Sequence, residues 1–247
     1  MKLILLRHGE SQWNLENRFT GWKDVPLTKT GIIEASLSAE KLVENDIKLS
    51  TIQTSLLQRA INTAKIISER MEFPIEKIEY DWRLNERHYG ALEGLNKSET
   101  ALKYGEKQVL IWRRSYDVVP PLLESNDKRH PKFNLVFKNI EAELPSGESL
   151  KNVIDRLNPF WENYFENIKK NFGNHLIVAH SNSLRAIIKI LENLSDEEIM
   201  SVNIPTGVPL VYTFNNDFKI NNKNFLIDEK DLIKKQKKIA NQGKINK

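Results

Sequence analysis

With 247 residues, the chain is long enough to bury a full core, either as one large α/β domain or as a domain with an insertion. It contains no cysteine, which excludes disulfides and thiolate zinc sites and is compatible with a reducing cytoplasm. The formal net charge is +4, no apolar run approaches the roughly 20 residues that span a bilayer, and Met1 to Leu6 is too short for a secretion signal, so we expect a soluble cytoplasmic protein without a membrane partner.

Strand-like apolar runs alternate with amphipathic helical stretches along most of the chain. Strands are predicted at Leu3–Leu6, Leu49–Gln53, Ile75–Tyr80, Leu176–Ala179 and Leu210–Phe214. Helices are predicted at Thr28–Val43, Leu56–Met71, Leu150–Asn171 and Ser183–Leu191, the first with Thr28 as N-cap and with Ile32, Ala35, Leu37, Ala39 and Leu42 on its packing side. This order predicts a three-layer α/β/α sandwich with a mostly parallel central sheet.

The alternation stops between about Leu95 and Pro145. This stretch contains Trp112-Arg113-Arg114, the turn-rich Val119-Pro120-Pro121 and a polar loop from Glu124 to Pro131. A long irregular segment in a compact domain is usually disordered or a functional lid, and the aromatic and arginine content favours a lid. We therefore expect residues 1–227 to form a single catalytic domain with a lid insertion at about 95–145.

Residues 228–247 form a basic C-terminal tail. They hold seven lysines and three acidic residues, so the rest of the chain is electrically neutral. Such a tail is able to bind nucleic acid or an anionic surface. A solvated or substrate-covering tail fits the neutral body better, and we expect no nucleic-acid partner.

Two histidines follow predicted buried strands. Arg7-His8-Gly9 comes directly after Leu3–Leu6, and His180 comes directly after Leu176–Ala179. In open α/β sheets, reactive groups collect beyond the carboxyl ends of the strands. One histidine there is more often a hydrogen-bonded structural residue, but the second occurrence favours function. A neutral imidazole can act as a nucleophile, and the Arg7 side chain offers a fork of donors that fits phosphoryl oxygens.

Further charged residues fit a phosphoryl-transfer site. Arg59 follows the second predicted strand, where a helix begins and its free N–H groups favour an anion. Glu86 lies between arginine and histidine residues and is either a structural salt-bridge partner or a general acid and base. Lys97, Arg113 and Arg114 either bind the carboxylate and far phosphate of a small dianionic substrate or form a solvated face.

The polar motifs of this chain occur together in one known family. They include Leu6-Arg7-His8-Gly9-Glu10-Ser11, Phe19-Thr20-Gly21-Trp22, Trp82 to Gly90, Gly94-Leu95-Asn96-Lys97, Trp112-Arg113-Arg114 and Asn203 to Gly207. From Leu3 to about Phe214, and again at its end, the chain resembles the 2,3-bisphosphoglycerate-dependent phosphoglycerate mutases, a branch of the histidine phosphatase superfamily. Arg-His-Gly is shared by the whole superfamily, whereas Glu86 to Gly90 and Trp112 to Arg114 are more specific to the mutases.

The resemblance implies a role for each matching residue. His8 carries a phosphoryl group, Glu86 donates and accepts the proton, and Arg7, Arg59 and His180 surround the transferring phosphoryl. The implied substrate-binding residues are Asn14, Thr20, Gly21, Tyr89, Lys97, Arg113, Arg114, Ser181 and Asn182. The family pattern has glycine in place of Ser181, and a side chain there either narrows the phosphate pocket or adds a hydroxyl donor.

The resemblance also implies a reaction. The enzyme interconverts 3-phosphoglycerate and 2-phosphoglycerate through 2,3-bisphosphoglycerate, which primes it as a cofactor, with no metal, as a homodimer or a dimer of dimers. A phosphatase on the same fold would need only that water reach phosphorylated His8, and a non-catalytic binding protein would keep only the pocket. The segment Ile239 to Lys244 resembles the C-terminal segment of the family. We expect the tail to close over the site as a mobile, lysine-bearing strand and so to favour the mutase reaction.

Overall fold

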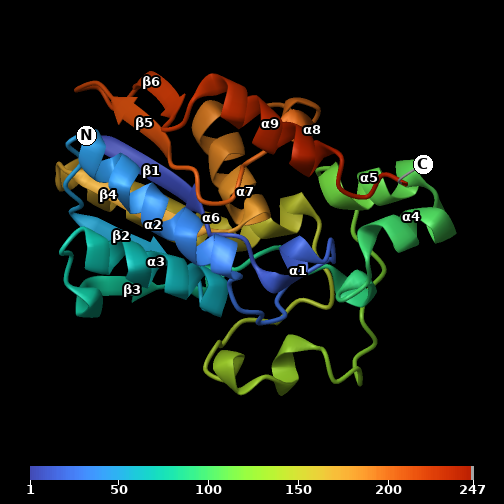
Figure 1. The fold of residues 1–247 in the computed structure, drawn as a ribbon. Coiled ribbons are helices and arrows are strands. Elements are labelled where there is room, and N and C mark those ends of the chain that lie inside the picture. The colour runs from blue at the N-terminus through green and yellow to red at the C-terminus, as the bar shows by residue number, and fades with distance from the viewer. Residues whose placement is uncertain (246–247) are drawn as a thin grey trace.

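The computed structural model describes residues 1–245, in which a central six-stranded sheet has the strand order β3-β2-β4-β1-β5-β6 (Figure 1). The strands are β1 (Lys2–Arg7), β2 (Thr51–Thr54), β3 (Ile78–Tyr80), β4 (Asn174–Ala179), β5 (Leu210–Phe214) and β6 (Ile220–Phe225). The pairs β1/β4, β2/β4 and β2/β3 are parallel, whereas β5 runs antiparallel to both β1 and β6. The prediction of a mostly parallel sheet is confirmed.

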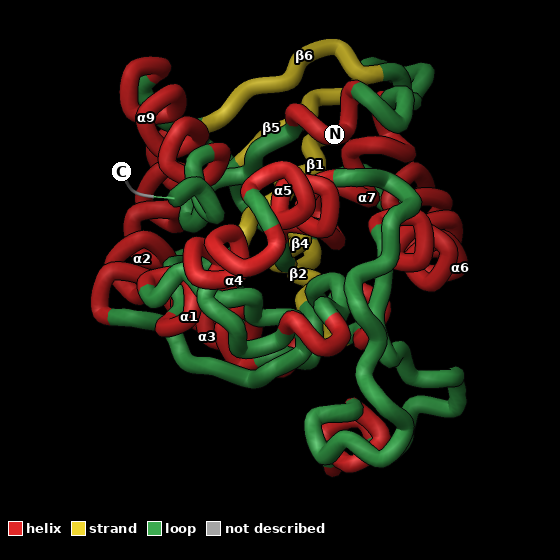
Figure 2. Tube along the Cα trace, turned by 90° about the vertical axis from the view of Figure 1, so that its right-hand side faces the viewer, coloured by secondary structure: helices red, strands yellow, loops and turns green. Residues whose placement is uncertain are grey.

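Helices cover both faces of the sheet (Figure 2). Leu3 and Leu5 of β1 pack in one apolar cluster with residues of α6 (Leu150–Lys170) and α7 (Ser181–Glu192). The alternate residues Ile4 and Leu6 pack in a second cluster with residues of α2 (Lys29–Glu44) and α3 (Gln58–Arg70). Successive residues of a strand point to opposite faces, so a strand buried on both sides reads as a continuous apolar run. This arrangement confirms the three-layer sandwich.

The four predicted long helices are present with small shifts at their ends. The Thr28 hydroxyl accepts a hydrogen bond from Gly31 N at 3.0 Å, which confirms Thr28 as the N-cap of α2. The predicted packing side of α2 was partly wrong, because Ile32 and Leu37 are each about half exposed. The buried side contains Gly31, Ala35, Ser38, Ala39 and Leu42, which follow the three- and four-residue spacing of one helix face.

Two sheet predictions need correction. Ile75–Lys77 forms a 3-10 turn after Pro74, and only Ile78–Tyr80 continues as strand β3 beside β2. Strand β6 was not predicted, because its sequence is polar and its side chains are almost all exposed. It pairs with β5 at the edge of the sheet, where no second apolar face is required.

The segment from 95 to 145 is partly helical rather than irregular. It begins with α4 (Lys97–Tyr104) and α5 (Glu106–Arg114), which pack against each other. Short 3-10 turns follow at Pro131–Phe133 and Leu135–Phe137. In Figure 1, α4 and α5 lie near the C-terminus, whereas the yellow-green later part of the segment extends away from them. The inserted segment is therefore divided into a helical part, α4 and α5, and a separate part that contains the 3-10 turns.

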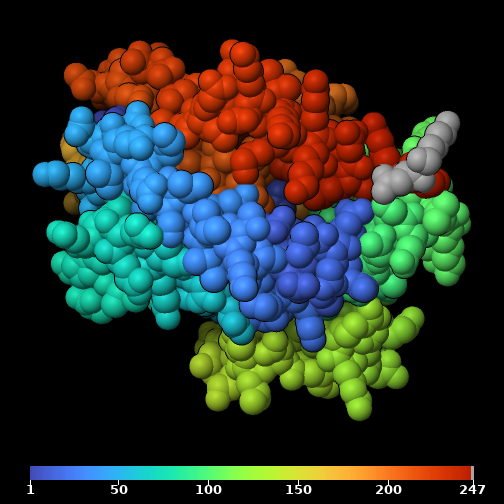
Figure 3. All heavy atoms as spheres, in the orientation of Figure 1, coloured from blue at the N-terminus to red at the C-terminus, as the bar shows by residue number. Residues whose placement is uncertain are grey.

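The basic tail forms helix α9 (Glu229–Ala240) instead of the expected strand. Acidic Glu229 and Asp231 lie in its first turn and Lys237 and Lys238 in its last, a distribution that stabilises the helix macrodipole. In Figure 3 the red tail lies against the dark blue N-terminal residues and the green residues of α4 and α5. Short helices α1 (Gln12–Leu15) and α8 (Glu198–Ser201) complete the fold, and none of the helices in residues 1–245 has the length and apolarity needed to cross a bilayer.

Candidate active site

The carboxyl ends of β1, β2 and β4 bring two histidines and an arginine together. His8 follows β1, His180 follows β4, and their ring centroids lie 5.0 Å apart. Arg59, in the first turn of α3 after β2, places its Nε 3.3 Å from His8 Nε2. The hydroxyl of Ser55 lies 2.7 Å from His180 Nε2. Because β2, β4 and β1 are parallel neighbours, these side chains meet at one edge of the sheet.

The hydrogen bonding of His8 fixes its tautomer. Its Nδ1 lies 2.7 Å from the carbonyl oxygen of Gly9, which can only accept, so Nδ1 carries the proton. The lone pair is then on Nε2, on the side of Arg59. Burial and the charges of Arg59 and Arg7 lower the pKa of His8 well below its ordinary value, so the ring is neutral near pH 7. The Nε2 lone pair accepts a hydrogen bond from Arg59 Nε at 3.3 Å. A neutral ring with its lone pair on Nε2 is the form needed for nucleophilic attack.

Backbone carbonyls hold the Arg59 guanidinium in place. Nη2 donates to the carbonyl of Gly21 at 2.9 Å, and Nη1 donates to that of Lys23 at 3.0 Å. Gly21 adopts a φ of +58°, a left-handed conformation that favours glycine. Burial lowers the pKa of Arg59 to about 10, which leaves it charged near pH 7. Gly21 thus acts through its backbone.

A cavity of about 50 Å³ adjoins this cluster. Five of its lining residues are cationic and Glu86 is its carboxylate; the lining consists of Arg7, Asn14, Arg18, Thr20, Glu86, Tyr89, Lys97, Arg113, Arg114, Ser181, Asn182, Ile239 and Gln242. His8, Arg59, His180 and Gly21 are not part of this lining. The two groups are nevertheless adjacent, because the lining residues Arg7 and Ser181 are the chain neighbours of His8 and His180. The charge of Arg7 accordingly lowers the pKa of His8.

Glu86 accepts hydrogen bonds from backbone groups. Its Oε1 accepts from Arg87 N at 2.8 Å and from Asn182 N at 3.0 Å. The Arg87 guanidinium instead donates to the carbonyls of Trp112 and Arg113. The geometry therefore favours the acid and base hypothesis for Glu86 over a salt bridge with Arg87.

Two buried arginines hold the C-terminal end of α5. Arg87 Nη2 donates to Trp112 O at 2.7 Å, and Arg185 Nη2 donates to Arg114 O at 3.1 Å. Cations are favourable at this end of a helix. Arg185 Nη1 also donates to Asn182 Oδ1 at 2.8 Å. These contacts fix the backbone from which Arg113 and Arg114 enter the cavity.

The tail contacts the same cations. Lys97 Nζ donates to Gln242 Oε1 at 3.3 Å, and Arg113 Nη2 donates to Ile239 O at 3.1 Å. Arg113 Nη1 also donates to the carbonyl of Gln242. Burial, together with neighbouring cations, lowers the pKa of Lys97 and brings that of Arg113 to about 9. A site with this excess of buried positive charge is suited to a polyanion.

The profile of the histidine phosphatase superfamily (branch 1) matches residues 3–143 and 122–222. The chain is 49% identical over 244 residues to the 2,3-bisphosphoglycerate-dependent phosphoglycerate mutase of Bacteroides fragilis, covering 98% of both chains. It belongs to the family of these mutases, within branch 1 of the histidine phosphatases. A mutase of the same name from Treponema denticola is 50% identical over 245 residues and 99% of both chains.

Solved structures show the same fold at low identity. A mycobacterial glucosyl-3-phosphoglycerate phosphatase with VO3 superimposes with a TM-score of 0.69 at 22% identity, covering 92% of this chain and 98% of that one. The alpha-ribazole phosphatase of Shigella flexneri gives a TM-score of 0.63 at 24% identity, covering 88% and 93%. These neighbours confirm the fold class of this phosphoglycerate mutase family member.

Some site residues have no role assigned from the sequence, although Ser55 and Asn203 lie in motifs that carry the family resemblance. Arg18 lines the cavity, and its only signal is its place before the Phe19-Thr20-Gly21 motif. Ser55 contacts His180, and Asn203 Oδ1 accepts a hydrogen bond from Arg114 Nη2 at 2.5 Å. The half-buried Ser181, the first residue of α7, does line the cavity. Within residues 1–245, no group of three or more histidine and carboxylate side chains is placed to hold a metal ion.

Proposed function

We propose that this chain interconverts 3-phosphoglycerate and 2-phosphoglycerate in glycolysis and gluconeogenesis, with 2,3-bisphosphoglycerate as the priming phosphoryl donor. The observation that carries the proposal is the neutral His8 ring, whose Nε2 lone pair faces Arg59 beside a cavity lined by five cations. The family of the close relatives supports it. Arg59 and Arg7 would stabilise the charge on the equatorial oxygens of the transferring phosphoryl.

The two transfers use the same groups in opposite directions. In the first, the N–P bond at His8 Nε2 breaks, the C2 oxygen of 3-phosphoglycerate binds phosphorus, and its proton passes to Glu86. In the second, His8 Nε2 attacks the phosphorus at C3 after the intermediate turns. The C3 oxygen leaves with the proton from Glu86, which yields 2-phosphoglycerate. A covalent intermediate replaces one difficult migration by two easier steps.

Binding of the substrate is proposed for the residues that line the cavity. Arg113, Arg114 and Lys97 suit the carboxylate and the distal phosphate, whereas Asn14, Thr20, Tyr89, Ser181 and Asn182 supply neutral polar contacts. The backbone of Gly21 contributes through Arg59. The catalytic set is then His8, Glu86, His180, Arg7 and Arg59, and the proposed chemistry uses no metal.

A phosphatase is the alternative activity on this fold. The cavity of about 50 Å³ has room for only a few water molecules, and Ile239 and Gln242 of the tail form part of its lining. A small cavity lined in part by the tail would limit the access of bulk water to phosphorylated His8 and so favour transfer to the bound phosphoglycerate. We propose that the tail moves when substrate enters.

A coupled assay of 3-phosphoglycerate conversion to 2-phosphoglycerate tests the proposal. We expect turnover that requires catalytic amounts of 2,3-bisphosphoglycerate and is unchanged by EDTA. Hydrolysis of 2,3-bisphosphoglycerate without mutase turnover would favour the phosphatase, and loss of activity with EDTA that manganese or zinc restores would contradict the metal-free reaction. For this function we propose a cytoplasmic homodimer or dimer of dimers, which sedimentation can establish.

A further inference from the structure

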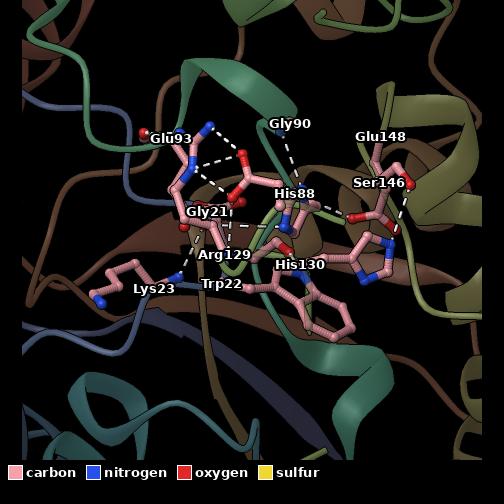
Figure 4. A network of polar contacts seen from close by, with 12 residues as sticks. Gly21, Trp22, Lys23, His88, Gly90, Glu93, Arg129, His130, Ser146 and Glu148 are labelled. Atoms are coloured by element: carbon pink, nitrogen blue, oxygen red, sulfur yellow. Dashed lines mark hydrogen bonds and ion pairs between the residues drawn. The ribbon is translucent and has the colours of Figure 1, made fainter. Parts of the chain in front are cut away.

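A buried acid lies behind the loop that holds Arg59. Glu93 is 5% exposed, and its Oε2 accepts a hydrogen bond from Lys23 N at 3.2 Å. Figure 4 shows Glu93 together with Gly21, Trp22 and Lys23 at this loop. A Cβ on Gly21 would lie 2.9 Å from Glu93 Oε2, so the carboxylate fits closely against the glycine. The mechanism above gives Glu93 no role.

The loop transmits the position of Glu93 to the catalytic cluster. The carbonyls of Gly21 and Lys23 accept hydrogen bonds from the two terminal nitrogens of Arg59. Arg59 Nε in turn donates to His8 Nε2 at 3.3 Å. Glu93 also raises the pKa of Arg59 through its charge. One carboxylate thus contacts the backbone N–H of Lys23, whose carbonyl holds Arg59.

The inserted segment completes the surroundings of Glu93. Arg129 Nη1 donates to the main-chain oxygen of Glu93 at 3.1 Å, and His130 lies in the same network (Figure 4). His88 Nε2 lies 4.0 Å from Glu93 Oε2. Because His88 Nδ1 accepts from Gly90 N, the neutral ring carries its proton on Nε2, facing the carboxylate.

The charges and N–H donors around Glu93 offset only part of the pKa increase that burial causes. Burial raises the pKa of Glu93 to about 7, against the charges of Arg129 and Lys23 and the backbone N–H donors, which favour the anion. Burial and the positive charges of His130, Arg156 and Arg129 lower the pKa of His88 to about 3, so this ring stays neutral. Glu93 therefore changes charge in the physiological range while His88 does not.

We propose that Glu93 is a positioning residue for phosphoryl transfer, whose ionised carboxylate holds the Gly21–Lys23 loop and thereby holds Arg59 against His8. A carboxylate accepts a backbone hydrogen bond more strongly than a neutral acid or amide does. The protonated form of Glu93 holds the loop less firmly, and Arg59 is then less well placed to bind the phosphoryl group.

The inference rests on the proposed function, and its test is the single-turnover rate of His8 phosphorylation by labelled 2,3-bisphosphoglycerate between pH 5.5 and 8.5. The variants are Glu93→Gln, Glu93→Leu and, as matched control, Glu99→Gln, which changes an exposed acid of α4. The readout is the ratio of wild-type to variant rate, because ionisation of the substrate cancels in it. Melting temperatures are measured for each variant.

At pH 8 we expect Glu93→Gln to be about tenfold slower than wild type, the order of one charge-assisted hydrogen bond. The ratio should fall toward one below pH 6, where wild-type Glu93 is itself neutral. Glu93→Leu should be slower still at every pH, and Glu99→Gln should match wild type. If the Leu variant does not fold, the Gln variant carries the test.

A ratio near one for Glu93→Gln at pH 8, or a ratio that does not change with pH, would overturn the positioning role. A rate that falls only in parallel with the melting temperature would also overturn it. Absence of any label in wild type contradicts the proposed function instead, so the two failures are distinguishable.

Discussion

The backbone N–H of Asn182 donates a 3.0 Å hydrogen bond to Oε1 of Glu86. Asn182 is the second residue of α7, so the carboxylate lies at the positively polarised end of a helix. Trp22 Nε1 donates to the main-chain oxygen of the same glutamate at 2.6 Å. These contacts hold Glu86 at the cavity wall, and its side-chain hydrogen bonds within residues 1–245 use Oε1, which leaves Oε2 for the proposed proton exchange with substrate.

Replacement of Glu86 by glutamine tests this role. The amide oxygen still accepts from Asn182 N, but the side chain cannot exchange the proton, so mutase turnover should fall by about a hundred- to ten-thousand-fold. Thermal unfolding should remain close to that of wild type. Glu141→Gln, at an exposed position, serves as the control. Loss of activity and of folded structure together would show that Glu86 is structural.

The buried Arg185 is expected to set substrate affinity. Arg185→Met removes its hydrogen bonds to Asn182 and to Arg114 O, so the KM for phosphoglycerate should rise about tenfold while kcat changes less. Arg185 has no carboxylate at ion-pair distance in the described part of the chain, so burying its charge costs stability. In the free energy of unfolding, removal of this cost offsets part of the stability lost with its hydrogen bonds. Arg70→Met, on the surface of α3, is the matched control. An unchanged KM would exclude the positioning role.

The fold and the strand-end cluster could be predicted because their signals are local. Apolar runs mark β1 and β4, and parallel neighbours bring His8 and His180 to one edge. Arg113 and Arg114 could be assigned only by resemblance, since the side chains that orient their backbone, Arg87 and Arg185, are distant in sequence.

Other contacts have no local signal. Ser55 and Arg18 are single polar residues in loops, and nothing in the sequence pairs them with His180 or with the cavity. The tail was expected at the site, but as a strand, because its lysine content hides the apolar side that includes buried Ile239. Nothing in the sequence distinguishes Glu93 from other acidic residues, since its proposed role depends on burial against Gly21.

Removal of the tail should shift the enzyme toward hydrolysis. Truncation after Asp228 removes α9 and the contacts of Gln242 with Lys97 and Arg113, which opens the cavity to water. We expect mutase turnover to fall more than 2,3-bisphosphoglycerate hydrolysis, and high salt to weaken retention of the intermediate by the full-length enzyme. Gln242→Ala should show a smaller change of the same sign. Equal rates in truncated and full-length enzyme would leave the tail without a catalytic role.

Stability should decrease as the pH falls below about 6.5. Burial lowers the pKa of all five histidines in the folded state. The unfolded chain then binds more protons, and each fully buried histidine, such as His8 or His180, lowers the free energy of unfolding by up to about 1.4 kcal/mol per pH unit below its unfolded pKa. Urea unfolding at pH 7.5, 6.5 and 5.5 measures this. A free energy of unfolding that is constant or rises on acidification would contradict it.

In the same experiment, Glu93 changes the free energy of unfolding in the direction opposite to that of the histidines. Its pKa is raised to about 7 in the folded state, so between its ordinary value and pH 7 the folded protein binds the extra proton and gains stability on acidification. Glu93→Gln should therefore make the acid loss steeper than in wild type. An unchanged slope would indicate that Glu93 does not titrate in this range.

The most direct test of the central claim is the identity of the phosphorylated residue. Incubation with labelled 2,3-bisphosphoglycerate should give an acid-labile, base-stable adduct on His8, as expected from its neutral ring with the lone pair on Nε2. His8→Ala should fold and lack the label, whereas His130→Asn, which changes a histidine of the insertion, should retain it. A label that persists in His8→Ala, or that maps to another residue in wild type, would contradict the account.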